Sequence, residues 1–560
     1  MPLVAPPNQQ AALPSCMPQW ERGAMVAVCL LILALKVCYV HELSTNSDES
    51  QHLHVAWGWT QGMVQYRDFF DNHTPLFHLA MAPLVAWIGE QADILFRMRL
   101  VMLPLFAGAL GCIYWLGARL YSQRAGIWAA LLAATHPVFL LKSTEFRADI
   151  LWMALWFATL AVGLTGPFTR RRAFVTGLLL GVVFGVSMKT VLLLVSLLGS
   201  LGLLCLLLSK PQRNALLAHS VGAVLPALAG LCIVPLAIGI FFASKGALGD
   251  LLYCVFEHNA VPGHNPGTLQ RLWLNTLFVI LLPVIGLVGR LILRMDPHHP
   301  LALQRALVFL ASAIFLLLLR CFWPHVTSQD YLPVLPLLAV TITPWVLRLT
   351  NRAAPLLLLL ATGIQIAIAV QRQSPLSTPE PSLDQALTSH ILQLTKPTDF
   401  VMDSKGETIF RRRPFRYVLE TMTLRRMESG LLPDTIVEEM VKTRTCVVLL
   451  KRLPSKSTQW VTKYYVPVTH KIHVTGCFLP VAQEGGGARP FEVAIPAEYV
   501  VASAEGSVQG IMDGVACAGP VFLSPGRHTF SSVDSRPLAV FWAQAAATGF
   551  TPFQAAQKKD

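Results

Sequence analysis

Two acidic residues, Asp48 and Glu49, stand side by side near the start of a long polar segment, residues 41–98, that directly follows the first apolar run of the chain. Ionisable groups at the edge of a membrane are costly to hold, so they mark candidate functional sites. We therefore expect the segment that carries Asp48 and Glu49 to be the first candidate for an active site.

A second acidic motif is the segment TEFRADILW, which carries Glu145, Arg147 and Asp149. The carboxylates of Glu145 and Asp149 are four residues apart, so a helix would place both on one face. The alternative is a flank that contacts lipid headgroups. Such flanks use Lys and Arg more often than acids, which favours a supporting role in the site for these three residues.

A third polar cluster lies in residues 320–340, RCFWPHVTSQDYLPVLPLLAV, with Arg320, His325 and Tyr331. A guanidinium, an imidazole and a phenol together suit the oxygen atoms of a phosphate group. The sequence alone leaves a second interpretation open, in which Arg320 reaches toward the lipid headgroups and Tyr331 is an interface aromatic.

The composition indicates a protein that crosses the membrane many times. Hydrophobic residues make up 54% of the chain and charged residues 13%, with a mean hydropathy of +0.53. Apolar runs of about 17–25 residues can cross the hydrocarbon core. About eleven spans are expected, at residues 24–40, 100–118, 125–141, 150–166, 173–188, 191–208, 221–243, 272–289, 306–322, 331–347 and 353–370.

Lys and Arg are more frequent in every second loop, which sets the expected orientation. The N-terminus is predicted to be cytoplasmic, and the 41–98 segment and the C-terminal region are predicted to lie on the outer, periplasmic side. The net charge of +13 is then mainly a topology signal and implies no nucleic-acid partner. The expected location is the inner (plasma) membrane.

Two short helices are expected to lie at the interface within the 41–98 segment. One begins at Asp48, and the second covers residues 75–88, with Thr74 and Pro75 as its cap and first residue. A helix that starts at the two acids would favour their ionised forms through its dipole.

The chain divides into five expected segments with different compositions. Residues 371–382 read as a Pro/Ser linker, and the two regions after it read as an α/β domain and a β-rich sandwich of accessory function. Whether Cys446, Cys477 and Cys517 form a disulfide is open. The segments are a cytoplasmic N-terminus (1–23), a transmembrane domain (24–370), the linker (371–382), an outer α/β domain (383–487) and an outer β-rich domain (488–560).

These motifs and their order resemble the glycosyltransferase C superfamily, in particular bacterial relatives of the protein O-mannosyltransferases and of the aminoarabinose transferases that modify lipid A. The resemblance covers residues 24–370. It rests on the acids after the first span, the segment GMVQYRDFFDNHTPLF (62–77), the TEFRADILW turn and QDYLPVLPLLA (329–339).

The resemblance implies an enzyme that moves a sugar from a polyprenyl phosphate to a hydroxyl acceptor on a glycolipid, polysaccharide or protein, with inversion at the anomeric carbon. Asp48 would be the base, and Glu145 and Asp149 would orient the base or the sugar. Arg320, His325, Tyr331 and His73 would contact the donor phosphate. Similar enzymes often have Lys near the position of His73, and some hold a divalent metal while others need none, so metal dependence is open.

A lipid or sugar transporter (flippase) is the alternative of another class. Transporters carry ionisable residues near the middle of their spans. In this sequence the polar residues gather at one predicted face of the membrane, which favours an enzyme.

Overall fold

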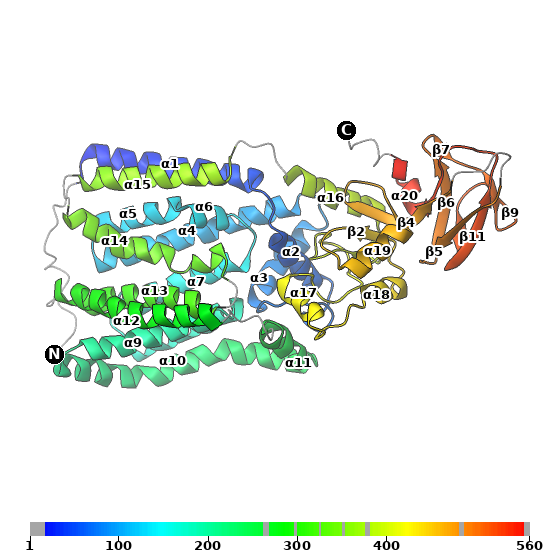
Figure 1. Cartoon of the computed structure of the whole chain (residues 1–560). Coiled ribbons are helices and arrows are strands. Elements are labelled where there is room, and N and C mark those ends of the chain that lie inside the picture. The colour runs from blue at the N-terminus through cyan, green and yellow to red at the C-terminus, as the bar shows by residue number, and fades with distance from the viewer. Residues whose placement is uncertain are drawn as a thin grey trace. The chain divides into compact units, whose positions relative to one another are not determined.

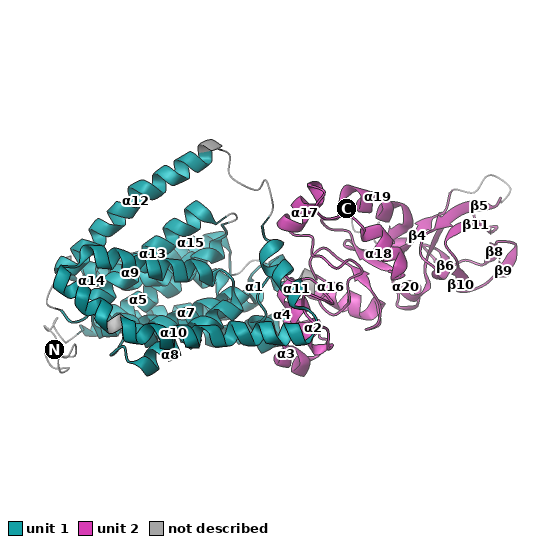
Figure 2. Cartoon of the chain, turned by 90° about the horizontal axis from the view of Figure 1, so that it is seen from below, with its two compact units in different colours: residues 1–49, 72–81, 95–381 teal, residues 50–71, 82–94, 382–560 magenta. Residues whose placement is uncertain are grey.

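The computed structural model describes residues 17–260, 268–295, 299–323, 326–349, 353–375, 381–480 and 487–553. The chain forms two compact units, which Figure 2 colours separately. Unit 1 comprises Met1–Glu49, Asn72–Met81 and Leu95–Pro381, and unit 2 comprises Ser50–Asp71, Ala82–Ile94 and Ser382–Asp560. Two of the borders, at 49/50 and 81/82, fall within α2 (Ser47–Thr60) and α3 (Leu76–Ile88), which correspond to the two interfacial helices expected from the sequence.

Unit 1 is a bundle of helices, many of them nearly parallel (Figure 1). In chain order they are α1 (Gln19–Glu42), α4 (Ile94–Leu120), α5 (Gln123–Thr135), α6 (Pro137–Lys142), α7 (Ala148–Leu164), α8 (Arg170–Val186), α9 (Thr190–Leu207), α10 (Lys210–Ser244), α11 (Leu248–Leu252), the π-helix η1 (Tyr253–Glu257), α12 (Thr268–Met295), α13 (Ala302–Phe322), the 3-10 helix η2 (Ser328–Tyr331), α14 (Leu335–Leu349) and α15 (Ala354–Arg372).

Each of the eleven expected spans falls mostly on helical residues of unit 1. Within the described part of the chain, seven helices are long and apolar enough to cross a membrane: α1, α4, α9, most of α10, most of α12, α13 and α15. The others are shorter. The run 125–141 is divided at Pro137 into α5 and α6, and α7, α8 and α14 have 17, 17 and 15 residues. The count of eleven therefore stays a prediction.

Glycines bring the backbones of α8 and α10 into direct contact. A Cβ atom added at Gly177 would lie 2.0 Å from the carbonyl oxygen of Ala227, and one at Gly230 would lie 2.2 Å from that of Phe174. Small residues let membrane helices approach this closely, where packing replaces the hydrophobic effect as the main attraction. This contact holds α8 against α10, and the loop that follows α8 leads directly into α9.

Unit 2 is built around two β-sheets. The larger sheet has eight strands in the order β1-β2-β4-β12-β6-β10, with β3 beside β4 and β7 beside β6; the smaller has the order β5-β11-β8-β9. The strands are β1 (Val401–Met402), β2 (Val447–Leu449), β3 (Tyr465–Pro467), β4 (Ile472–Phe478), β5 (Arg489–Val493), β6 (Ala497–Ser503), β7 (Gly506–Ser507), β8 (Gly510–Met512), β9 (Val515–Cys517), β10 (Val521–Leu523), β11 (Gly526–Ser531) and β12 (Ala539–Trp542). The helices that follow the membrane region are α16 (Pro381–Leu394), α17 (Thr421–Glu428), α18 (Ile436–Lys442), α19 (Ser455–Tyr464) and α20 (Ala543–Ala547).

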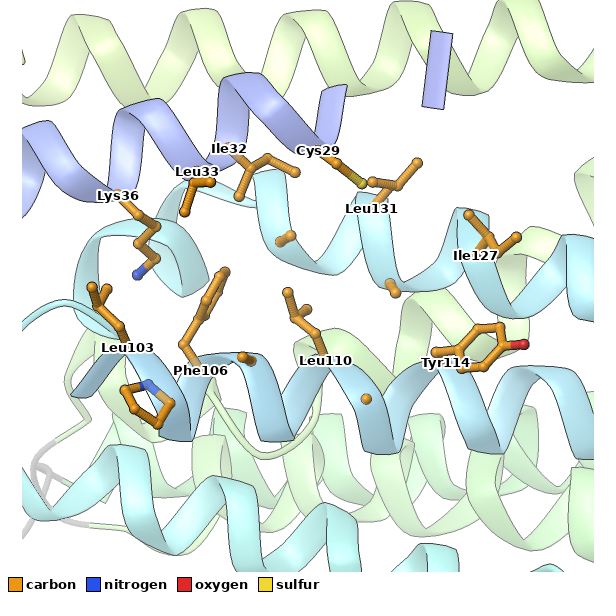
Figure 3. A pocket seen from close by; sticks show the side chains of 15 residues that line it. Cys29, Ile32, Leu33, Lys36, Leu103, Phe106, Leu110, Tyr114, Ile127 and Leu131 are labelled. Carbon is orange, nitrogen blue, oxygen red and sulfur yellow. The ribbon is translucent and has the colours of Figure 1, made fainter. Parts of the chain in front are cut away.

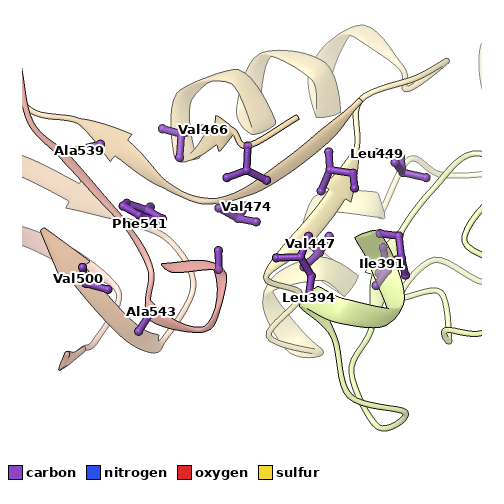
Figure 4. Packing of buried hydrophobic residues seen from close by; sticks show 14 of the residues in the cluster. Ile391, Leu394, Val447, Leu449, Val466, Val474, Val500, Ala539, Phe541 and Ala543 are labelled. Carbon is purple, nitrogen blue, oxygen red and sulfur yellow. The ribbon is translucent and has the colours of Figure 1, made fainter. Parts of the chain in front are cut away.

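Both faces of the large sheet are covered. Val447 and Leu449 of β2 pack with Ile391 of α16, as Figure 4 shows, whereas Val448 between them packs with the core of α18 and α19. This alternation is the period of two expected of a strand buried on both faces. Farther along, residues of both sheets share one core that includes Tyr499.

The eight-stranded sheet takes strands from both sides of the expected boundary at 487/488, so that boundary does not separate two sheets. The alternation of apolar and polar residues predicted the strands. It did not predict which strands pair with each other when 30 or more residues separate them. The three cysteines for which a disulfide was left open, Cys446, Cys477 and Cys517, are free.

Part of the first polar segment belongs to unit 2, although nearly 300 residues separate it from the rest of that unit. The carbonyl of Ile409 lies 2.8 Å from Nδ1 of His54, and the N–H of Phe70 donates to the carbonyl of Arg416 (3.3 Å). Arg411 donates to Glu90 at 2.8 Å. Composition along the chain cannot predict such a long-range association.

The glycine contact between α8 and α10 yields a stability prediction. Gly177→Ala should lower the thermal midpoint of the detergent-solubilised protein, because the new methyl group overlaps a backbone oxygen and overpacking costs about 1–3 kcal/mol. Gly239→Ala on α10 is the matched control, since a Cβ there meets nothing within 4 Å. Equal midpoints for both variants would contradict the close contact.

Candidate active site

Asp48 stands in the first turn of α2, and the local sequence fixes the start of that helix. Oδ1 of Asn46 accepts the N–H of Asp48 (3.1 Å), and Oε2 of Glu49 accepts the N–H of Asn46 (3.1 Å). This reciprocal arrangement is a capping box, which satisfies backbone donors that a helix start leaves open. The two acids thus begin the helix, as the sequence predicts.

The side chain of Glu49 is fully buried and is held on both oxygens by Arg99 of α4. Nε and Nη2 of Arg99 donate to its two oxygens at 2.8 and 2.6 Å, and the N–H of Phe146 donates to Oε1 at 2.8 Å. Arg99 also donates to the carbonyl of Leu43 at 2.8 Å. Glu49 therefore ties the start of α2 to the end of α1, to α4 and to the loop after α6, and its carboxylate has no exposed surface.

Arg147 connects the two acidic motifs that lie about 100 residues apart in the sequence. Its Nη1 donates to Oδ2 of Asp48, and its Nε lies 3.1 Å from Oδ2 of Asp149 and 3.8 Å from Oε2 of Glu145. The structure thus brings together Asp48, Glu145, Arg147 and Asp149, all of which the sequence placed in the site.

Lys189, in the loop between α8 and α9, extends this chain of charges. Its Nζ lies 3.4 Å from Oδ1 of Asp149 and contacts Oδ1 of Asp330 in η2. Asp330 is held in turn by Thr327, whose N–H and hydroxyl donate to Oδ2 at 2.7 and 2.8 Å. Asp48, Asp149 and Asp330 therefore share two cations, Arg147 and Lys189.

Burial and neighbouring charges oppose each other in the pKa values of this cluster. Burial alone would lower the pKa of Arg147, but Asp48, Asp149 and Glu145 raise it well above its usual value. Burial likewise disfavours the charged form of Lys189, and Asp149 and Asp330 outweigh it and raise its pKa. Burial, and then the charge of Glu49, raise the pKa of Glu145 against the opposing effect of Lys142, which lies 2.6 Å away.

Asp48 is the accessible end of this chain. A quarter of its side chain is exposed, against 4% for Arg147, 9% for Asp149 and 1% for Asp330. A partly exposed carboxylate that a buried guanidinium orients has the geometry expected of a general base.

The residues that the sequence predicted to contact the donor phosphate lie in different elements and differ in their exposure. His73 is half-buried and acts electrostatically on Asp149. Tyr331 is half-buried and directly follows Asp330 at the end of η2, and Arg320 is exposed near the end of α13. His325 lies outside the described residues.

Sequence reasoning missed Lys189, Asp330 and Arg99 as parts of the site. In the sequence, Lys189 was used only to predict the membrane orientation. Its place in a short loop on the predicted outer side is unusual, because Lys and Arg are more frequent in cytoplasmic loops. Arg99 had a clearer signal, since a charge inside an apolar helix is costly unless it has a partner.

A divalent metal, which the resemblance left open, does not fit these carboxylates. Arg147 contacts both Asp48 and Asp149, the two acids from the motifs at which a metal would be expected. Over the residues that the structure describes, no group of three or more His, Cys, Asp or Glu side chains is placed to hold a metal ion.

Residues 72–238 match the family model described as "Dolichyl-phosphate-mannose-protein mannosyltransferase". Among solved structures, the chain is similar to ArnT from Cupriavidus metallidurans in the apo state, with 13% identity over 81% of this chain and 97% of that chain and a TM-score of 0.51. The same protein bound to undecaprenyl phosphate gives 12% identity over 81% and 98% of the two chains, with a TM-score of 0.52. No curated protein matches the chain in sequence.

The chain has the glycosyltransferase C fold. This confirms the fold class predicted from the sequence, apart from the number of spans, and it is the fold that the resemblance implies. The chain is a multi-pass membrane protein, and the family model and the fold both point to glycosyl transfer.

The buried pair of Arg99 and Glu49 gives a second stability prediction. Arg99→Met should cost about 3–5 kcal/mol, because it leaves a buried carboxylate without its counter-charge. The measurement is thermal unfolding of the purified protein. Adding Glu49→Gln to the first variant should recover part of the loss. A double variant as unstable as Arg99→Met would show that the charge of Glu49 is not the cause.

Proposed function

We propose that this protein is a membrane glycosyltransferase that moves a sugar from a polyprenyl phosphate to an acceptor hydroxyl, with Asp48 as the general base. The observation that carries the proposal is the partly exposed Asp48 carboxylate, which the buried guanidinium of Arg147 holds in place. The match of residues 72–238 to the mannosyltransferase family and the glycosyltransferase C fold support the chemistry.

In the proposed reaction, the acceptor oxygen attacks the anomeric carbon on the face opposite the phosphate. The new carbon–oxygen bond forms as the bond from that carbon to the phosphate oxygen breaks, and the polyprenyl phosphate leaves with the electron pair. The acceptor proton passes to Asp48. A carboxylate is basic enough because the hydroxyl becomes acidic as its oxygen bonds to carbon.

Arg147 has a positioning role in this proposal. Its Nη1 donates to Oδ2 of Asp48 and so holds the carboxylate in place. Asp149 holds Arg147 from the far side at 3.1 Å and Glu145 lies 3.8 Å away, so the supporting role expected for these acids is the orientation of the guanidinium. Glu49, which is buried, would act on the base only through the position of α2.

The leaving phosphate gains negative charge, so cations must lie near it. Lys189 is the charged residue that the structure adds to the candidates: 22% of its side chain is exposed, and its raised pKa keeps it protonated at neutral pH. Together with His73 it could replace the lysine that similar enzymes often have near that position. Arg320, His325 and Tyr331 remain candidates from the sequence.

The proposed location is the inner membrane, with the site and the C-terminal region on the periplasmic side, as the loop charges predict. The fold favours this enzyme over the transporter alternative. The candidate acceptors are the same three that the sequence predicted: a hydroxyl group of a glycolipid, of a polysaccharide or of a protein.

Asp48→Asn tests the base. The amide keeps the shape but cannot accept the proton, so transfer from a purified polyprenyl-phosphate sugar should fall by about a hundredfold to ten-thousandfold. The measurement is product formation at saturating donor, beside a thermal unfolding curve that should match the wild type. Glu42→Gln, at the end of α1, is a carboxylate control expected to keep activity. Full turnover by Asp48→Asn would remove Asp48 from this role.

Chelation tests the role given to Arg147. Because a guanidinium already joins Asp48 and Asp149, we expect transfer to continue in excess EDTA and to gain nothing from added Mg²⁺ or Mn²⁺. The readout is the initial rate before and after chelation. A rate that collapses with EDTA and returns with Mn²⁺ would mean that a metal displaces Arg147 from the carboxylates.

A further inference from the structure

A groove runs along the outside of unit 1 between α1, α4 and α5. It has a volume of about 640 Å³, and its lining is apolar except for a few polar atoms such as Nζ of Lys36 (Figure 3). Lys36 and Leu103 lie at one end, and Tyr114 and Ile127 at the other. Leu33, on its rim, is 59% exposed, so the groove opens away from the bundle.

The length of the groove matches one leaflet of a bilayer. On α4 the lining extends from Leu103 to Tyr114, which is about 16 Å at about 1.5 Å per residue. The hydrocarbon core is about 30 Å thick, so one leaflet contributes about 15 Å. α1 and α4 are both long and apolar enough to cross the membrane, so the groove faces hydrocarbon.

One end of the groove is tied to the loop that carries the site. Nζ of Lys36 donates to the carbonyl of Leu140 at 2.8 Å and to the hydroxyls of Ser143 and Thr144 at 2.6 and 2.9 Å. These three bonds use all the donors of an ammonium group. The same Nζ lies 4.1 Å from the centre of the Phe106 ring, which lines the groove. Glu145 and Arg147 follow Thr144 directly.

We propose that this groove binds one acyl chain of a membrane phospholipid, which packs on Phe106 beneath Lys36 and thereby supports the loop of Glu145 and Arg147. The chain excludes water from the Lys36 bonds. Because the three N–H groups of Lys36 point at protein oxygens, the groove recognises the hydrocarbon and not the headgroup.

The dimensions favour this occupant over two others. A polyprenyl chain is much longer than one leaflet and would leave most of its length outside a groove of this size. A helix of a second copy is about 10 Å wide with its side chains, so a stretch of helix as long as the groove would need more than the groove's volume of about 640 Å³.

Two glycines of α4 provide a matched pair of variants. Gly111 lines the groove and Gly108 does not, yet a Cβ at either meets nothing within 4 Å. Gly111→Leu should therefore fill the groove without disturbing the bundle, and Gly108→Leu should change only the lipid-facing surface. Both replacements gain helix propensity, by about 1 kcal/mol.

The test uses the full chain in nanodiscs made with a phosphatidylethanolamine that carries a photoreactive acyl chain. Irradiation followed by peptide mass spectrometry should place label on groove residues such as Cys29 and Leu110 in the wild type. With Gly111→Leu the yield should fall about tenfold, which corresponds to about 1.4 kcal/mol of lost contact, and Gly108→Leu should label like the wild type.

A stability readout separates the lipid from other occupants. Delipidation should lower the thermal midpoint of the wild type and of Gly108→Leu, and added phosphatidylethanolamine should restore it, whereas the midpoint of Gly111→Leu should not respond. The proposal is overturned by equal labelling of the three proteins, by rescue with polyprenyl phosphate but not phospholipid, or by a change from dimer to monomer in Gly111→Leu.

Discussion

The candidate site depends on one buried guanidinium. Arg147 is 4% exposed and joins Asp48 to Asp149. Taking a cation out of water is costly unless carboxylates surround it, and each carboxylate in turn needs the cation. These contacts hold the start of α2 against the loop before α7, the two elements that carry these groups. Lys189 repeats the arrangement between Asp149 and Asp330.

This alternation of charges explains how the first polar segment can carry two adjacent acids at a membrane boundary. Glu49 is neutralised by Arg99, so it supports α2 without adding net charge, and Asp48 alone is left partly exposed. The neighbouring acids thus have different environments: one is fixed in the core and the other faces solvent. The surroundings of a carboxylate, and not its residue type, determine whether it suits a structural or a catalytic role.

The sequence predicted the local features of this protein well. Composition and apolar runs located the helices of unit 1. The helical spacing of apolar residues after Asp48 and Glu49 located α2, and the cap at Thr74 located α3, because these signals act over a few residues. The grouping of Asp48 with Glu145, Arg147 and Asp149 followed from their shared predicted face of the membrane. Lys189 and Asp330 were missed as partners because their pairing depends on how α8, α9 and η2 pack, which no local pattern encodes. For the same reason the strands of unit 2 were foreseen but their common sheet was not.

The assignment of Ser50–Asp71 and Ala82–Ile94 to unit 2 has a consequence for how such chains can be recombined. Arg411 depends on Glu90 for its counter-charge, and the carbonyl of Ile409 on the imidazole of His54 for its hydrogen-bond partner. A chimera that exchanges only the residues after 381 between two relatives would leave these groups facing foreign neighbours. Functional chimeras, and natural divergence of the C-terminal region, therefore require the two early segments to be exchanged or to change together with it.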